Sequence, residues 1–149
     1  MADLSEEEQK EYERALLLYR EGQQFREAGD HKAALQRWQQ AWQGVYRLGI
    51  VEGIASVSES IGLLLGEQGD PDAAIFLMNA GQAWADAGQE ARAKQVSEHL
   101  WALRETFTLL LGEAKTNPER ARTAFDLARV ELATERPERA LLLLQTAWN

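Results

Sequence analysis

Apolar residues recur every three or four positions along most of the chain, and this spacing is typical of amphipathic helices. The pattern breaks at glycine, aspartate and proline, which commonly begin or end helices. No sustained alternation of Val, Ile and Thr predicts a strand. We therefore predict an all-α protein of about seven helices, over residues 5–28, 30–48, 50–68, 71–86, 89–111, from 117, and from 137 to 148.

Several of the predicted helix starts carry recognisable capping residues. Ser5 and Glu8 fit a capping box, and Asp30 is an N-cap. Asp70 is followed by proline, which suits the first helical position. Short connections favour antiparallel neighbours. We therefore expect one domain, residues 1–149, of stacked antiparallel helical hairpins at about 5–48, 50–86 and 117–148, with a long helix at about 89–111 before the last hairpin.

One arrangement of residues occurs twice, around the corners Gly29-Asp30 and Gly69-Asp70. In each copy a glycine precedes the corner and small residues follow it. The first copy consists of Leu18, Glu21, Gly22, Phe25, Ala34, Trp38 and Ala41, and the second of Ser58, Ile61, Gly62, Leu65, Ala74, Met78 and Gly81. Matching offsets in two copies indicate a repeated helical hairpin.

The small residues of each copy predict a close crossing of two helices. Because side chains three and four positions apart share a helix face, we expect Gly22 to face Ala34 and Gly62 to face Ala74. The space beside each crossing would be filled by Phe25, Trp38, Leu65 and Met78. The alternative is ordinary packing with coincidental glycines, although glycine inside a helix costs about 1 kcal/mol relative to alanine.

Two weaker copies leave the later part of the chain ambiguous. One contains Ala124, Leu127, Ala128, Glu131, Ala140, Leu144 and Ala147. The other overlaps the second strong copy and contains Gly81, Trp84, Gly88, Ala93 and Leu100. Because one helix does not easily serve two hairpins, the register of the repeat between residues 70 and 112 stays open.

The corners of the two strong copies are 40 residues apart, and the joining segment reads Leu48-Gly49 and then Gly53-Ile54-Ala55. This pattern resembles the tetratricopeptide repeat, in a variant longer than the usual period of about 34 residues. Such longer repeats occur in kinesin-light-chain-like proteins and bacterial regulatory proteins. The resemblance covers Leu18–Gly88. The chain departs from the family pattern at Glu21, Ser58 and Glu131, where a leucine, a large residue and an aromatic are usual.

The resemblance implies a non-catalytic protein–protein interaction module. In this family the first helices of successive hairpins line a concave groove that binds a peptide or a partner helix. Carried over by register, the groove residues here are Tyr19, Gln23, Arg26, Glu59, Leu63 and Glu67. We expect a groove of mixed charge, with affinity from a few apolar anchors.

The C-terminal segment predicts a second kind of contact. It carries four consecutive leucines, more than one helix face can bury, and an unfinished end of a stacked array exposes such a face. We expect self-association, as a homodimer, through Leu141, Leu143, Leu144 and Trp148. The alternative is that this helix folds back between the two before it. A structural self-assembly protein is therefore the second functional hypothesis.

Charge is unevenly distributed in this chain of net charge −8. Leu48–Ala91 contains no Lys or Arg but seven acids, which are Glu52, Glu59, Glu67, Asp70, Asp72, Asp86 and Glu90. Since phosphate binding needs clustered cations, we expect no nucleic-acid ligand. A basic or apolar protein surface is the better match, unless the acids serve only solubility and helix N-termini.

The remaining composition excludes several functions. The absence of cysteine removes disulfides and thiolate metal sites. His31 and His99 lack a carboxylate at metal-ligand spacing, and the glycines of GLLLGEQGD lack the Lys-Ser or Lys-Thr of a phosphate loop. The acidic N-terminus lacks the basic start and apolar segment of a signal peptide, and no apolar run approaches the about 18 residues of a membrane span. We expect a cytoplasmic protein without enzymatic activity, metal, cofactor or membrane contact.

The chain is rich in tryptophan for its size, and Trp42 and Tyr46 lie beyond the core positions of the repeat. Either aromatic packing closes the array or one or two tryptophans anchor a partner. The residues concerned are Trp38, Trp42, Trp84, Trp101 and Trp148.

Overall fold

The computed structural model describes residues 4–113 and 117–133, and six α-helices account for nearly all of them. The helices are α1 (Glu6–Glu27), α2 (His31–Leu48), α3 (Val51–Glu67), α4 (Ala73–Asp86), α5 (Glu90–Glu113) and α6 (Asn117–Ala133). No strand occurs in this part of the chain, so the all-α prediction is confirmed. The predicted seventh helix, from 137 to 148, lies outside the described residues.

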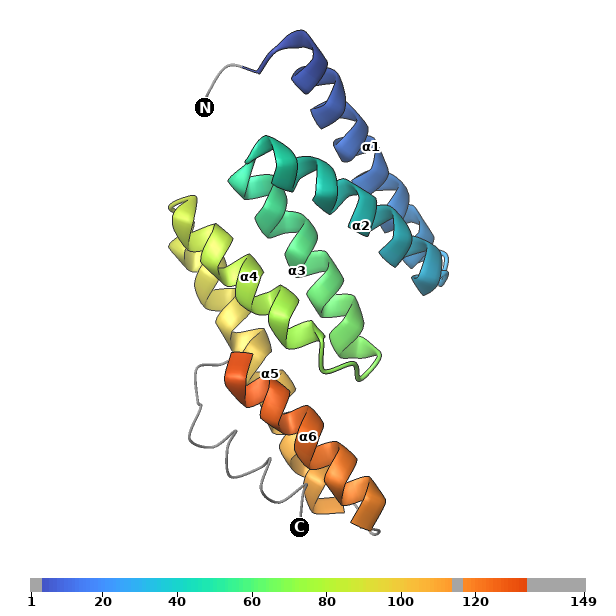
Figure 1. Cartoon of the computed structure of the whole chain (residues 1–149), viewed down its shortest axis with the longest axis vertical. Coiled ribbons are helices and arrows are strands. Elements are labelled where there is room, and N and C mark those ends of the chain that lie inside the picture. The colour runs from blue at the N-terminus through green and yellow to red at the C-terminus, as the bar shows by residue number, and fades with distance from the viewer. Residues whose placement is uncertain (1–3, 114–116, 134–149) are drawn as a thin grey trace.

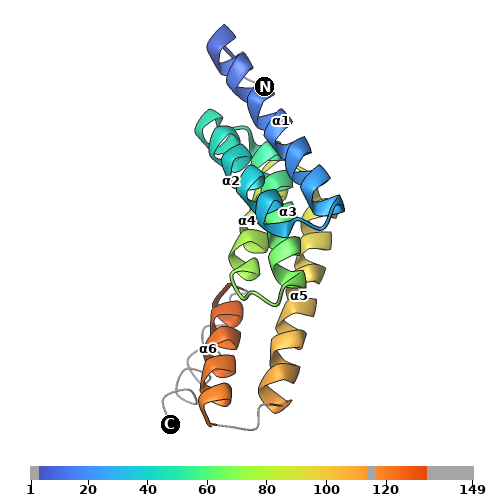
Figure 2. The ribbon, with the colours of Figure 1, turned by 90° about the vertical axis from the view of Figure 1, so that its right-hand side faces the viewer.

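The helices stack in chain order along the long axis of the molecule (Figure 1). Each helix packs against the next one, α3 also contacts α5, and α4 also contacts α6. In the view turned by 90°, α2, α4 and α6 lie toward one side of the molecule and α1, α3 and α5 toward the other (Figure 2). The predicted stack of antiparallel helical hairpins is therefore confirmed.

The corners between helices depend on glycines with positive φ. Gly29, Gly49, Gly69 and Gly88 have φ of 83°, 68°, 74° and 77°, and they are separated by 20, 20 and 19 residues. A residue with a Cβ atom rarely adopts this left-handed conformation, whereas glycine does so at little cost. The chain therefore reverses direction at a nearly constant interval, and the two Gly-Asp corners of the sequence mark every second reversal.

The first two helices begin as their sequences predict. Ser5 Oγ accepts a hydrogen bond from the backbone N–H of Glu8, and the Glu8 carboxylate accepts one from the N–H of Ser5, which completes the capping box. Asp30 Oδ1 accepts from the N–H of Ala33 at 3.1 Å. These contacts satisfy backbone donors that would otherwise lack partners in the first turn of each helix.

The start of α4 differs from the prediction. Residues Asp70 and Pro71 form a tight turn, and the regular helix begins at Ala73 instead of residue 71. Asp70 Oδ1 accepts from the N–H of Asp72 at 2.9 Å, and the N–H of Ala73 donates to the carbonyl of Asp70, three residues earlier. In α2 the corresponding bond spans four residues. The second hairpin therefore enters its second helix through a tighter turn than the first.

Gly22 and Gly62 lie at crossings between helices, as predicted, with Trp38 and Leu77 as their nearest neighbours. A Cβ atom added to Gly22 would lie 2.4 Å from Cδ1 of Trp38, and one added to Gly62 would lie 2.8 Å from Cγ of Leu77. Both glycines are buried. The nearest residues are thus Trp38 and Leu77; the expected partners, Ala34 and Ala74, are fully buried on the same two helices.

Met78 does not fill the second crossing. Its side chain is 38% exposed, whereas the neighbouring Leu77 is buried against Gly62. Met78 was expected there because it follows its corner by the same interval as Trp38. The tighter turn at Asp70-Pro71 rotates α4 relative to the sequence pattern, so the residue one position earlier faces α3.

Apolar packing among the described residues forms three clusters, and each is shared by three consecutive helices. The first joins α1, α2 and α3 around Trp38 and Ile61, and the second joins α3, α4 and α5 around Leu77 and Trp84. The third joins α4, α5 and α6 around Leu127. Each helix thus depends on its immediate neighbours, which is the energetics expected of a stacked array.

Ion pairs connect α6 to the rest of the stack. Arg129 pairs with Asp72 at the start of α4. Glu131, at a position where the repeat pattern predicts an aromatic residue, is fully buried, and its Oε1 lies 3.7 Å from Nη1 of Arg104 on α5. Because an unpaired buried charge is costly, this arrangement favours α6 packing on α5. The predicted hairpin of residues 117–148 extends beyond the described part of the chain.

Candidate functional site

The α1 and α3 helices, which contribute all the predicted groove residues, contact each other through side chains. The hydroxyls of Tyr19 and Ser60 share a hydrogen bond of 2.7 Å. One turn or two further along, Arg26 forms an ion pair with Glu67. Residues about 41 positions apart in the sequence are therefore neighbours on one face. The repeat period brings them together, because it places the first helix of one hairpin beside the first helix of the next.

Tyr19 is held firmly in place on this face. Its backbone carbonyl accepts a hydrogen bond of 3.1 Å from the indole N–H of Trp38, and its ring centroid lies 6.2 Å from that indole. The side chain is half-buried, whereas Gln23 on the next turn is exposed. Tyr19 thus presents a fixed aromatic edge, and Gln23 presents an amide that is open to solvent.

A cleft of about 240 Å³ lies between α3 and α5, beside the predicted groove residues. Its walls come from α3, α4 and α5, and its lining residues are Gly62, Leu63, Gly66, Glu67, Leu77, His99, Ala102, Leu103 and Thr106. The buried side chains of Leu77 and Leu103 give it an apolar floor. Gly66 on α3 and Ala102 on α5 add little bulk to the walls of the cleft.

The charges around the cleft are balanced. Arg26 neutralises Glu67, so one of the two predicted acidic contacts is already paired. Partial burial raises the pKa of the Glu59 carboxyl above its ordinary value, and the positive charges of His99 and Arg92 oppose that rise. Arg92 itself lies 4.6 Å over the ring of Trp84. The face formed by α1, α3 and α5 is therefore of mixed charge.

The sequence predicted residues on the α3 side of the cleft but none on its α5 side. Leu63 and Glu67 line the cleft as members of the predicted set, whereas His99, Leu103 and Thr106 were not predicted. They were missed because the helix at 89–111 had no assigned hairpin partner. Gly88 could have indicated this side of the cleft. It follows Gly69 at nearly the same interval as the earlier corner glycines, so the helix after it begins a third hairpin.

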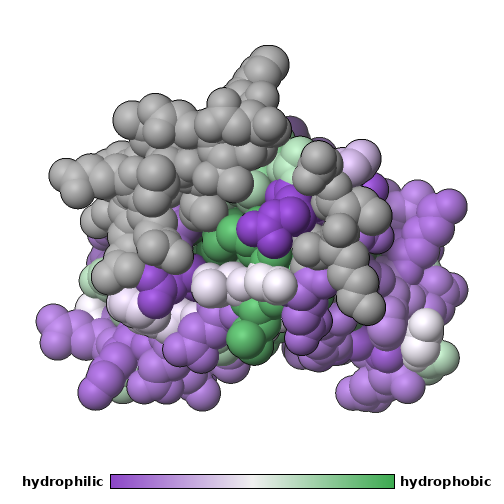
Figure 3. Space-filling view, turned by 90° about the horizontal axis from the view of Figure 1, so that it is seen from below, coloured by the Kyte–Doolittle hydropathy of each residue, from purple (hydrophilic) through white to green (hydrophobic). Residues whose placement is uncertain are grey.

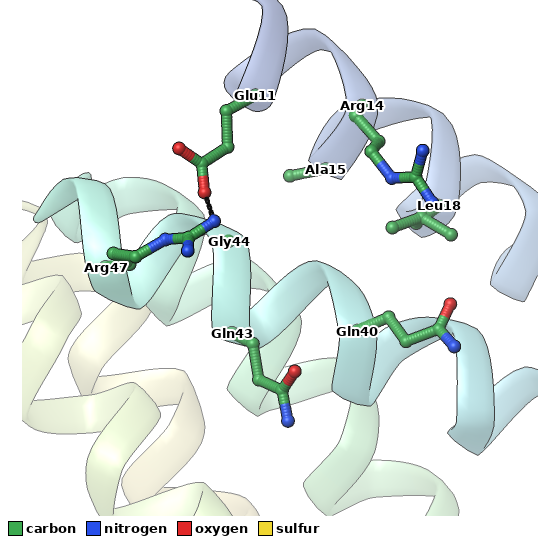
Figure 4. Close-up of a pocket in the computed structure, with 8 residues that line it drawn as sticks. All are labelled: Glu11, Arg14, Ala15, Leu18, Gln40, Gln43, Gly44 and Arg47. Atoms are coloured by element: carbon green, nitrogen blue, oxygen red, sulfur yellow. Dashed lines mark ion pairs between the residues drawn. The ribbon is translucent and has the colours of Figure 1, made fainter. Parts of the chain in front are cut away.

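A second hollow, of about 360 Å³, lies between α1 and α2 on the first hairpin (Figure 4). Its lining is mostly polar: Glu11, Arg14, Ala15, Leu18, Gln40, Gln43, Gly44 and Arg47. The ion pair between Glu11 and Arg47 crosses one end of it. The close packing of Gly44 against Ala15 limits its depth, since a Cβ atom at Gly44 would lie 3.2 Å from that of Ala15.

The tryptophans divide between packing and exposure. Trp38 and Trp84 are buried in the core. Trp42 is half-buried; its indole N–H donates to Ser58 Oγ at 3.0 Å, and its ring stacks on Tyr46 at 4.8 Å. Ser58, where the family pattern has a large residue, thus serves as the acceptor for an aromatic from α2. Trp101 is 49% exposed under the guanidinium of Arg104, and Trp148 lies outside the described residues.

The predicted self-association residues, Leu141, Leu143, Leu144 and Trp148, lie outside the described part of the chain. Large apolar side chains are nevertheless exposed on the last two helices: Leu109 is 67% exposed on α5, and Phe125 is 50% exposed on α6. A space-filling view onto this end of the molecule shows apolar surface in a hollow with hydrophilic surface on both sides (Figure 3). The surface at this end is therefore more apolar than the hydrophilic surface beside it.

Comparison with known proteins finds no family model, no curated protein and no solved structure that matches this chain. Within residues 4–113 and 117–133, no three histidine, aspartate or glutamate side chains form a group that could hold a metal ion. None of the helices that the structure describes combines the length and the apolar character needed to cross a membrane.

Proposed function

We propose that the chain is a non-catalytic protein–protein interaction module of the tetratricopeptide type. It binds a peptide or a partner helix on the face formed by α1, α3 and α5. The observation that carries this proposal is the cleft between α3 and α5, which has an apolar floor and is lined by Glu67, the partner of Arg26 on α1. A shallow apolar cleft with a few polar groups at its edge suits an extended or helical segment.

Affinity at this face comes from an apolar anchor. A side chain of the partner enters between Leu63 and Leu103, where it removes apolar surface from water at about 25 cal/mol per Å². His99 at the rim offers a hydrogen bond to the partner backbone, and the Thr106 hydroxyl, which donates to the Ala102 carbonyl, accepts one. Because Arg26 neutralises Glu67, the partner needs no strong net charge at this point.

Site-specific crosslinking in cell extract tests the proposal. A photo-reactive amino acid at Thr106, an exposed position in the cleft, should crosslink a discrete partner that mass spectrometry then identifies. The same probe at Ala85, an exposed position on α4 outside the cleft, is the control. Equal recovery of the same proteins from both positions would count against binding on this face.

A structural self-assembly role is the second candidate function. The specific observation in its favour is the exposure of Leu109 and Phe125 at the α5–α6 end, next in the chain to the predicted C-terminal helix with its four leucines. Burial of this surface against a second copy would drive a homodimer. Sedimentation of the wild type and of Leu143→Glu tests it: a dimer that the substitution dissociates supports the role, and a monomer in both cases excludes it.

A further inference from the structure

A hollow of about 560 Å³ lies at the other end of the first two hairpins, apart from the cleft between α3 and α5. Three segments far apart in the sequence meet there: the start of α1, the corner between α2 and α3, and the end of α4, which lie together at the upper left of Figure 1. The lining residues are Leu4, Tyr12, Leu48, Gly49, Ile50, Val51, Glu52, Asp86 and Ala87.

Most of this lining is apolar. Leu4 and Tyr12 of the α1 segment stand opposite Leu48, Ile50 and Val51 of the corner. Val51 remains 37% exposed although it belongs to the wall of the hollow. The corner keeps its shape because Gly49 has a positive φ and because the N–H of Ile50 donates to the carbonyl of Val45. Backbone geometry therefore defines the wall of the hollow that the corner forms.

The charge at the rim is negative. Glu52 and Asp86 are the acids of the lining, and the described residues that form it include no Lys, Arg or His. The nearest arginine in sequence, Arg47, is paired with Glu11. The C-terminal ends of α2 and α4 and the N-terminal ends of α1 and α3 all lie at this hollow, so their dipoles oppose one another and the negative charge of the rim comes from the two carboxylates.

These observations point to an occupant that is both apolar and cationic. We propose that the hollow is a second docking site, for a segment of another protein that carries a large apolar side chain beside Lys or Arg. The apolar side chain lies against Leu48 and Val51, and the cation lies near Asp86, whose Oδ1 also accepts a hydrogen bond from Gln82. This docking site is independent of the proposed groove and uses other residues.

Three short peptides test the chemistry without altering the protein. The probe carries Lys-Leu-Lys between Gly-Ser flanks; the two controls carry Lys-Ala-Lys and Glu-Leu-Glu in the same frame. In amide NMR spectra of the full chain, the probe at millimolar concentration should shift the signals of Leu48–Glu52 and of Asp86 and Ala87. Both controls should shift them at least about threefold less, because each lacks one of the two interactions.

A pair of isosteric double variants tests the protein side. Glu52→Gln with Asp86→Asn should weaken binding of the Lys-Leu-Lys peptide by about three- to tenfold at low salt and flatten its salt dependence. Glu98→Gln with Glu105→Gln, two exposed acids of α5, is the matched control and should leave binding within about twofold. Circular dichroism melts verify that all variants fold.

Several results would overturn the inference. These are equal shifts with all three peptides, shifts confined to the α3–α5 cleft, no shifts at all, or equal weakening by the two double variants. Shifts at the hollow that grow with protein concentration in the absence of peptide would assign it to a second copy of this chain and would likewise overturn the proposal. Shifts confined to the α3–α5 cleft would support the proposed groove, and the other outcomes leave the role of that cleft untouched.

Discussion

Gly22 of α1 lies against the indole of Trp38 on α2, and the indole N–H donates a hydrogen bond to the carbonyl oxygen of Tyr19 on the turn before that glycine. The absent side chain at position 22 makes room for the largest residue of the first cluster. The same indole holds Tyr19, which faces α3. One small residue thus connects the packing of the first hairpin with the geometry of the proposed groove.

Gly22→Ala should destabilise the protein by about 1–3 kcal/mol, because the new Cβ atom would lie 2.4 Å from the Trp38 ring and force it to move. Urea unfolding measures the change. Gly112→Ala is the matched control: Gly112 also lies in a helix, but nothing is within 4 Å of its added Cβ atom, so that variant should gain up to about 1 kcal/mol. Equal stability of the two variants would contradict the crossing described here.

Gly29→Ala should cost about 1–2 kcal/mol although no atom lies within 4 Å of the added Cβ, since the cost comes from the φ of 83°. Gly29→Asn should cost less, because asparagine tolerates the left-handed region better than alanine does. Thermal unfolding of the two variants provides the comparison. If alanine and asparagine are equally well tolerated, the corner does not require a left-handed residue.

Ser58→Ala should cost about 1–3 kcal/mol, because it leaves the indole N–H of Trp42 without its acceptor in a partly buried position. In the background of Trp42→Phe, the same substitution should cost clearly less, since the donor is already absent. A double-mutant cycle measures the difference as a coupling energy. Additive effects of the two substitutions would show that the bond contributes nothing to stability.

Glu59→Gln should raise stability at neutral pH more than at pH 4. The folded state raises the pKa of this carboxyl above its ordinary value of 4.5, chiefly through burial. As pH rises from 4.5 through the folded pKa, the unfolded chain loses the proton first, so wild-type stability falls over this window. Glutamine cannot ionise, so the variant does not lose stability over this pH window. The loss in the wild type is limited because His99 and Arg92 oppose the rise of the pKa. A stability difference that is the same at pH 4 and pH 7 would refute the expectation.

Local chemistry made most of the fold predictable. The capping residues Ser5 and Asp30 act within one turn of the chain, so their positions fixed the starts of α1 and α2. Glycine adopts the left-handed conformation of the corners at the least cost, and the spacing of these glycines revealed the period of the stack. These features depend on neighbouring residues alone, which is why a single sequence suffices to read them.

The errors arose where the geometry depends on more than local sequence. Asp70-Pro71 was expected to begin a helix, but the chain forms a tight turn there, and the resulting rotation placed Leu77 instead of Met78 at the crossing. The contribution of His99 and Leu103 to the cleft depends on how α5 packs against α3. The sequence of α5 alone does not determine that packing. The Arg26–Glu67 ion pair depends in the same way on the placement of α1 beside α3.

The affinity of the partner recovered by crosslinking, measured with a blocked cleft, tests the central claim most directly. Ala102→Arg places a long side chain in the cleft from an exposed position on α5, and Ala85→Arg adds the same charge on α4. We predict that the first variant binds the partner at least about tenfold more weakly than wild type and that the second binds it equally well. Equal binding by all three proteins would mean that the cleft between α3 and α5 is not the binding site.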